Sequence, residues 1–207
     1  MKKIIFALTI LFTAYQSYSQ GCVAIRSTGG FCTADQTDAE GNANSNKWLF
    51  NFNTRYFKSW RHFVGTEEQK QRKAAGTEVI NHNTSIDFFL SRNLNKYWSI
   101  AIDLPVINNA RSSLYEHGGK KRHSTHSFGL GDIRIAAYRW LADPAKNPKG
   151  NIQLGAGIKF ATGDYKYQDF FYTSDTTKVL GPVDQSIQLG DGGTGFTTEM
   201  NGYYNFS

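Results

Sequence analysis

Residues 151–160 read NIQLGAGIKF, and this stretch decides the fold class. One set of alternate positions is apolar: Ile152, Leu154, Ala156, Ile158 and Phe160. The positions between them hold polar residues and glycine. Because successive side chains of a strand point to opposite faces, the stretch predicts a strand with one apolar face and one polar face. Lipid-facing strands of membrane barrels have this pattern.

The same alternation recurs along the chain and predicts six strands. They cover residues 48–57, 79–90, 97–104, 128–141 and 151–160, and a last strand from residue 195 onward. The first has the roughly 9–11 residues that a tilted strand needs to cross a bilayer. Pro105 is expected to end the third strand. The sequence therefore predicts an all-β fold, an antiparallel transmembrane β-barrel.

The connections between these strands alternate in length. Long segments follow the first, third and fifth strands, at 58–78, 107–127 and 161–194, and short ones follow the second and fourth, at 91–96 and 142–150. Outer-membrane barrels combine short periplasmic turns with long external loops. The three long segments are therefore expected outside the cell.

A soluble β-sandwich also has alternating strands, so it is the alternative fold. Aromatic residues at the strand ends favour the barrel, because they form two girdles at membrane interfaces. Near the short turns these are Trp48, Tyr97, Trp98, Tyr138 and Trp140. Near the long loops they are Tyr56, Phe57, Phe128, Tyr165 and Tyr167.

Six strands are fewer than the eight or more that closed single-chain membrane barrels need, and an open sheet edge in lipid is costly. We therefore expect residues 47–207 to be the N-terminal portion of a larger barrel. Closure by oligomerisation is the alternative, and the oligomeric state stays open.

Residues 1–19 predict an export signal. Lys2 and Lys3 form a basic start, residues 4–14 are apolar, and Ser17 and Ser19 supply small residues for cleavage. The apolar run is shorter than the roughly 20 residues of a spanning helix. We expect cleavage near Ser19 and delivery to the outer membrane of a Gram-negative bacterium.

Residues 20–46 are expected to form a periplasmic segment, and they contain the only two cysteines, Cys22 and Cys32. In an exported chain these two are expected to form a disulfide. The alternative is that Cys22 is lipidated, although residues 19–21 lack the leucine-like residue that usually lies three positions before such a cysteine.

The inward positions of the predicted strands carry charges of both signs. The candidate lumen-facing residues are Arg55, Asp87, Asp103, Arg134 and Lys159. Charged rings of this kind determine the selectivity of a water-filled pore. These residues suit a water-filled lumen or a satisfied polar interior equally well, and a water-filled lumen would make the protein a channel for a small-molecule solute.

Other kinds of site are disfavoured. His117, His123 and His126 share one basic segment with Glu116, but their spacing fits no metal signature, and residues 120–122 (Lys-Lys-Arg) oppose a cation. We expect no metal or other cofactor, and a mobile external loop instead. No G-x-S-x-G motif occurs, so we expect no enzymatic activity.

Nucleic acid is not an expected partner. The net charge falls from +6 to +4 when the signal is removed, because Lys2 and Lys3 are its only charged residues. The basic clusters at 70–73 and 120–122 lack the interleaved aromatic residues on which bases stack. Membrane lipid and lipopolysaccharide are the expected surroundings.

Three stretches carry a family resemblance: GLGDIRIAAYRWL at 129–141, IQLGAGIKFATGDY at 152–165 and DQSIQLGDGGTGF at 184–196. They resemble the outer-membrane barrel family named for the meta-pathway of phenol degradation. The resemblance implies a channel or transporter for small or hydrophobic solutes, and a barrel that continues beyond Ser207. It assigns no ligand-binding residue. The alternatives are a structural or surface-binding protein that acts through its external loops, and a lipid-modifying barrel enzyme.

Overall fold

The computed structural model describes residues 48–118, 121–174 and 176–206. The predicted signal at 1–19 and the Cys22–Cys32 pair lie outside the described residues. Among the described helices, none has the length and hydrophobicity needed to cross a membrane.

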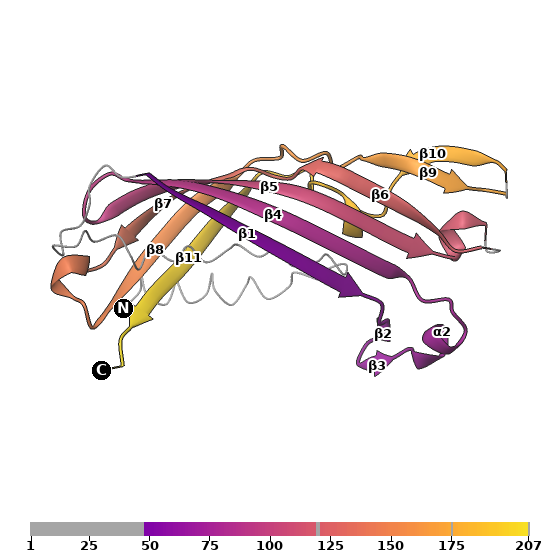
Figure 1. Ribbon diagram of the computed structural model, residues 1–207, viewed down its shortest axis with the longest axis horizontal. Coiled ribbons are helices and arrows are strands. Elements are labelled where there is room, and N and C mark those ends of the chain that lie inside the picture. The colour runs from indigo at the N-terminus through magenta and orange to yellow at the C-terminus, as the bar shows by residue number, and fades with distance from the viewer. Residues whose placement is uncertain (1–47, 119–120, 175, 207) are drawn as a thin grey trace, which may run out of the picture.

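The described chain is all-β, and its main feature is a curled antiparallel sheet in the form of a half-barrel (Figure 1). The path through the sheet is β1 (Trp48–Ser59), β4 (Ile80–Asn93), β5 (Trp98–Ser113), β7 (Arg134–Trp140), β8 (Gly150–Lys159) and β11 (Gly195–Tyr204). A further strand, β6 (His123–Leu130), pairs with β5. All these strand pairs are antiparallel.

Strands β6 and β7 act as one interrupted strand. β5 pairs with β7 from Trp98 to Asp103 and with β6 from Val106 to Ser113. Residues 131–133 lie between the two and form the interruption. The six predicted strands are therefore present, with the fourth divided.

The third strand does not end at Pro105, so the prediction there was wrong. Pro105 lies inside β5, opposite the interruption, and its carbonyl accepts a hydrogen bond from the Gly131 amide. The missing N–H of proline faces the same side as this carbonyl, where the ladder is already broken, so the strand continues at little cost. Consequently, much of the loop predicted at 107–127 is strand.

Most of the remaining elements lie in the three long connections, which leave the sheet at one end (Figure 1). The first connection holds β2 (Phe63–Val64), β3 (Glu67–Glu68) and α2 (Lys70–Ala74), and the second holds the 3-10 turn η2 (Tyr115–His117). The third holds the hairpin β9 (Gln168–Tyr172) and β10 (Lys178–Pro182), followed by η4 (Gln185–Ile187). At the opposite end, β4–β5 and β7–β8 have short connections, and the second contains η3 (Pro144–Lys146).

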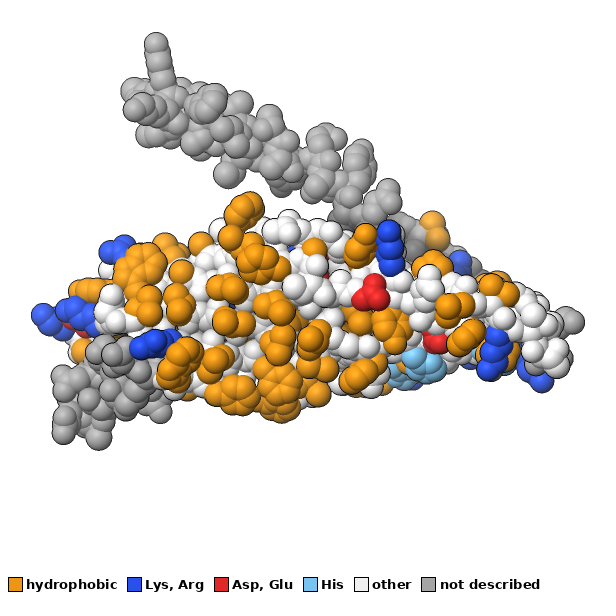
Figure 2. Space-filling view, turned by 90° about the horizontal axis from the view of Figure 1, so that it is seen from above, with side chains coloured by type: hydrophobic (Ala, Val, Ile, Leu, Met, Phe, Trp, Pro, Cys, Tyr) orange, Lys and Arg blue, Asp and Glu red, His pale blue; other side chains and the backbone are white. Residues whose placement is uncertain are grey.

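The convex face of the sheet is apolar. Figure 2 looks onto this face, where hydrophobic side chains fill the middle and Lys and Arg gather toward the two ends. The predicted outward residues of β5 and β8, among them Ile100, Ile102, Leu154 and Ile158, are exposed. Large apolar side chains are therefore left on the surface of the sheet.

The concave face is polar and largely buried. Its residues include Ser91, Ser99, Asn109, Arg134 and Gln153, each less than one-tenth exposed. Tyr138 and Trp140 also lie on this side, which corrects their expected place in an outward aromatic girdle. Alternation persists through Tyr138, Arg139 and Trp140, because only Arg139 of the three is exposed.

Candidate functional site

The concave face encloses a cavity of about 690 Å³, which we call the inner groove. Strands β1, β4, β5, β7, β8 and β11 all contribute side chains to its wall. The five candidate lumen-facing residues all line this groove: Arg55, Asp87, Asp103, Arg134 and Lys159.

Arg134 is the centre of one charged cluster in the groove. It lies directly opposite Asp103 in the ladder, with Nε 3.9 Å from Asp103 Oδ2, and it forms an ion pair with Glu199 of β11. Only 5% of Arg134 is exposed. Burying a guanidinium requires carboxylate partners, so Asp103 and Glu199 explain how the charge is tolerated.

Tyr138 extends this cluster across the sheet. Its hydroxyl donates to Glu199 Oε2 at 3.0 Å and lies 3.3 Å from Arg134 Nη2. The ring lies over Gly155 of β8, where an added Cβ would come within 2.6 Å of Tyr138 Cε1. Glycine on the polar face of the NIQLGAGIKF strand therefore makes room for the tyrosine that links β7 to β11.

A second charged cluster is built on Asp132, in the interruption between β6 and β7. Its Oδ2 accepts from Lys159 Nζ at 2.8 Å, and its Oδ1 accepts from the Gly163 amide at 2.9 Å. Lys159 also donates to Asp191 Oδ1 at 2.5 Å and to the Gly193 carbonyl at 2.6 Å. The cluster ties the end of β8 to both ends of the segment between β8 and β11.

That segment was predicted to be an external loop, and only part of it projects from the sheet. The β9–β10 hairpin extends beyond the sheet, whereas residues 183–191 return to the concave side (Figure 1). Gln185, Ser186, Gln188, Gly190 and Asp191 of this returning part line the inner groove. We call residues 183–191 the inner segment.

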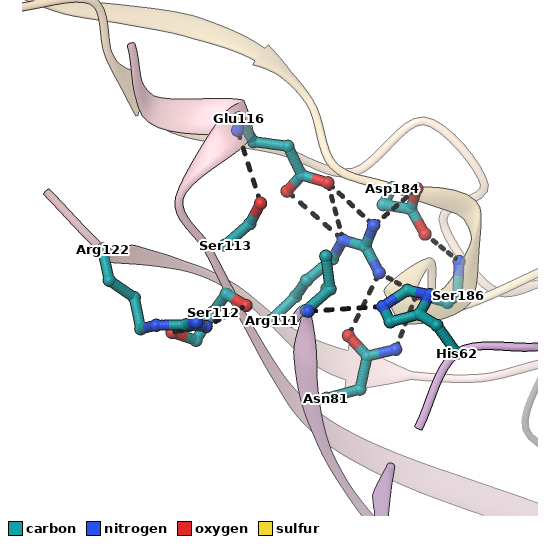
Figure 3. A network of polar contacts seen from close by, with 10 residues as sticks. His62, Asn81, Arg111, Ser112, Ser113, Glu116, Arg122, Asp184 and Ser186 are labelled. Carbon is teal, nitrogen blue, oxygen red and sulfur yellow. Dashed lines mark hydrogen bonds and ion pairs between the residues drawn. The ribbon is translucent and has the colours of Figure 1, made fainter. Parts of the chain in front are cut away.

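Arg111 links the inner segment to the outer end of the wall (Figure 3). Its guanidinium forms a two-pronged contact with Glu116, with Nε and Nη2 at 2.9 and 2.7 Å from Oε1, and it also reaches Asp184 at 3.4 Å. Nη1 donates to Asn81 Oδ1 at 3.2 Å and to Ser186 Oγ at 3.3 Å. Paired donors of this kind fix geometry as well as charge.

Sequence reasoning missed Arg111 and Asn109 as parts of this site. Arg111 and Asn109 fell in a predicted loop because Pro105 was taken as a strand end. Extending the odd-position alternation of residues 99, 101 and 103 beyond Pro105 would have placed both on the inward face. The sequence also indicates that Asp132 faces inward, but it does not indicate that Lys159 is its partner.

The three histidines that were predicted to share one loop do not meet at one point: His117 lies in η2, and His123 and His126 lie on β6. The rings of His117 and His123 lie 5.4 Å apart, whereas His126 lies beside Asp169 on β9 with a 3.7 Å ion-pair distance. Within the described residues, no group of three potential metal ligands is present. His117 Nδ1 accepts from the Tyr172 amide at 3.2 Å, and burial together with His123 lowers the pKa of His117.

Comparison with known proteins adds no identity: no protein-family model matches the chain, and no curated protein is significantly similar to it.

Proposed function

We propose that this chain forms part of an outer-membrane β-barrel that passes small solutes through a water-filled lumen, with the inner groove as a section of the lumen wall. The observation that carries the proposal is the reversed polarity of the sheet. Large apolar side chains such as Leu154, 46% exposed, cover the convex face, while Arg134 and Asp87 are buried on the concave face.

Soluble monomers rarely expose an apolar surface of this kind. Each exposed apolar side chain on the convex face costs about 25 cal/mol per Å² of apolar area in water. The contiguous apolar field of Figure 2 is the kind of surface that soluble monomers avoid. Contact with the lipid hydrocarbon removes this free-energy cost, and the polar concave face can then line a water-filled lumen.

Tryptophan–arginine pairs at the short-turn end of the sheet support a membrane interface there. Arg92 lies 5.3 Å from the ring of Trp48, and Arg139 lies 5.7 Å from the ring of Trp98. Each pair joins neighbouring strands, since Trp48 is opposite Arg92 and Trp98 is opposite Arg139. Tryptophan and arginine favour the headgroup region, where the ring and the charge are both solvated well.

We propose that further strands complete the barrel. Within the described residues, β1 pairs only with β4, and β11 pairs only with β8, so each presents an open edge. Unpaired backbone groups cannot remain in hydrocarbon. The resemblance to the meta-pathway phenol-degradation barrels, proposed on the three motifs of residues 129–196, agrees with a larger barrel.

The groove favours small polar solutes. Arg55, Arg134 and Lys159 present cationic groups, and Asp87, Asp103, Asp132 and Asp191 present carboxylates around the same space. Wall groups of both charge signs can take the place of water around a polar solute. Because both signs are present, neither anions nor cations are excluded completely.

The test is the ionic current carried by the full-length gene product in planar bilayers, after fractionation has located it. Ser85 lies on the groove wall at a half-buried position of β4, so Ser85→Asp and Ser85→Lys place opposite charges at one point. Under a salt gradient, the two variants should shift the reversal potential in opposite directions. A protein that is recovered in the soluble periplasm, or that inserts and carries no current, would refute the channel.

A second candidate is a surface-binding role, favoured by the β9–β10 hairpin. It projects from the sheet and exposes Phe170, Val179 and Leu180 (Figure 1). A barrel that inserts into planar bilayers but carries no ionic current would favour this surface-binding role over the channel.

A further inference from the structure

The inner segment is fitted to the groove wall by its apolar side chains. Val183, Ile187 and Leu189 are all buried, and Ile187 is 0% exposed, although the surrounding concave face is polar. The wall is indented at this place: a Cβ added to Gly129 would come within 2.8 Å of Leu189 Cδ1, and one added to Gly131 would lie 3.3 Å from the Leu189 carbonyl. Two glycines therefore leave the space that Leu189 occupies.

Its backbone is held by side chains of three neighbouring wall strands. The Ile187 carbonyl accepts from Asn109 Nδ2 of β5 at 3.1 Å and also from Ser127 Oγ of β6. The Ser186 carbonyl accepts from Asn83 Nδ2 of β4 at 3.3 Å. Asn109 and Ser127 are themselves buried, so these hydrogen bonds are shielded from competing water.

The segment is also braced internally and at both ends. Gln188 Nε2 donates to the Val183 carbonyl at 2.7 Å, and its Oε1 accepts from the Tyr167 amide at 2.8 Å. Arg111 holds Asp184 near the start, and the Asp132–Lys159 cluster holds Asp191 at the end. A connection fastened in this way keeps one position.

We propose that the inner segment is a fixed constriction of the lumen that sets the largest solute able to pass. The inference rests on the proposed channel function and deepens it. Gln185, Ser186 and Gln188 supply one side of the narrowing, and Arg55, Asp87 and Arg134 face the same space from the strand wall. Solutes therefore pass between neutral amide or hydroxyl groups on one side and charged groups on the other.

The experiment introduces a cysteine at the constriction and then attaches a bulky group to its thiol. Gln185 is exposed and lines the groove, so Gln185→Cys should react with a trimethylammonium methanethiosulfonate reagent added in water. The matched control is Val179→Cys on the projecting hairpin, where the side chain is also exposed. Unsubstituted protein receives the same reagent, which accounts for Cys22 and Cys32.

We expect the single-channel current of Gln185→Cys to fall at least about two-fold on modification, because the added group narrows the path of the ions. The current of the Val179→Cys control should change little. Gln185→Trp compared with Val179→Trp gives the same contrast without a reagent, and exclusion of larger neutral polymers by Gln185→Trp measures the solute limit directly.

The outcomes separate the constriction from the channel. A channel that conducts, with equal effects at positions 185 and 179 in both variant pairs, would overturn the constriction and leave the channel standing. A thiol at position 185 that mass spectrometry shows to be unmodified would also overturn the constriction, because the position would lie off the water path. Absence of current in the unsubstituted barrel would overturn both.

Discussion

Lys159 Nζ lies 2.8 Å from Oδ2 of Asp132, and this contact joins β8 to the interruption between β6 and β7. The Asp132 side chain is only 2% exposed and also accepts from the amides of Gly163 and Asp191. One carboxylate therefore holds a wall strand together with the start and the end of the connection that carries the inner segment. Gly163 is required there, because a Cβ at this position would come within 2.6 Å of the Leu189 carbonyl.

Asp132→Asn should lower the free energy of unfolding by about 2–3 kcal/mol, because it weakens charge-assisted hydrogen bonds to a buried group. Urea unfolding in detergent micelles measures the change. Asp191→Asn is the control: its side chain is 66% exposed, so its pair with Lys159 should contribute less than about 1 kcal/mol. Equal losses in the two variants would contradict the central role of Asp132.

Arginine on the convex face should destabilise a membrane-inserted barrel. Ile86→Arg and Leu154→Arg are expected to cost about 2–4 kcal/mol near the bilayer midplane. Ser85→Arg, next to Ile86 on β4 but on the groove wall, should cost less because its side chain reaches water. Unfolding in lipid vesicles compares the three variants. A larger loss for Ser85→Arg than for Ile86→Arg would argue against lipid on the convex face.

Gly155→Ala should be destabilising by about 1–3 kcal/mol, because the new methyl group would overlap the Tyr138 ring. The double variant with Tyr138→Ser removes the ring, so the cost of the methyl group should nearly vanish there. Unfolding free energies of the four proteins form a double-mutant cycle. Strictly additive losses would show that the ring does not lie over Gly155.

The attachment of the β9–β10 hairpin should weaken in acid. His117 must be neutral to accept the Tyr172 amide, and burial first, then His123, lower its pKa below the ordinary 6.5, against the opposing effect of Glu116 and Asp169. The unfolded state then binds the proton first, so the contact is at full strength above about pH 6.5 and loses stability as the pH falls toward the lowered pKa.

Hydrogen-exchange protection of the Tyr172 amide measures this effect. Protection, corrected for the intrinsic exchange rate, should fall between about pH 7.5 and pH 5 in the unsubstituted protein. His117→Phe retains a ring against Phe171 but has no titrating group, so its protection should be nearly independent of pH over this range. Equal pH dependence in both proteins would exclude His117 as the cause.

The facing of the strands could be predicted because alternation is a local property. The exposed positions of Ile100, Ile102 and Leu154 follow directly from period two. The extent of β5 could not be predicted, because Pro105 is tolerated only where its neighbour strand is broken, and that break lies at Gly131, far along the chain.

The inner segment lay beyond sequence reasoning for a different reason. The stretch DQSIQL at 184–189 has no periodic pattern, and its position depends on hydrogen bonds from Asn109 and Ser127 and on space beside Gly129. Such complementarity belongs to the tertiary structure. The five candidate lumen-facing charges were found because each lies on a regular strand, whereas Arg111 was missed with the outer half of β5.

The continuation of β5 past Pro105 has a consequence for the height of the wall. Its 16 residues span about 53 Å at 3.3 Å per residue, and a strand tilted by about 45° rises about 37 Å. The apolar band of such barrels is about 25 Å tall, so the wall would stand well above the lipid. The entrance would then be a rigid, hydrogen-bonded vestibule, and Arg111 with its carboxylate partners would lie at the level of the aqueous headgroups, where arriving solutes first meet the protein.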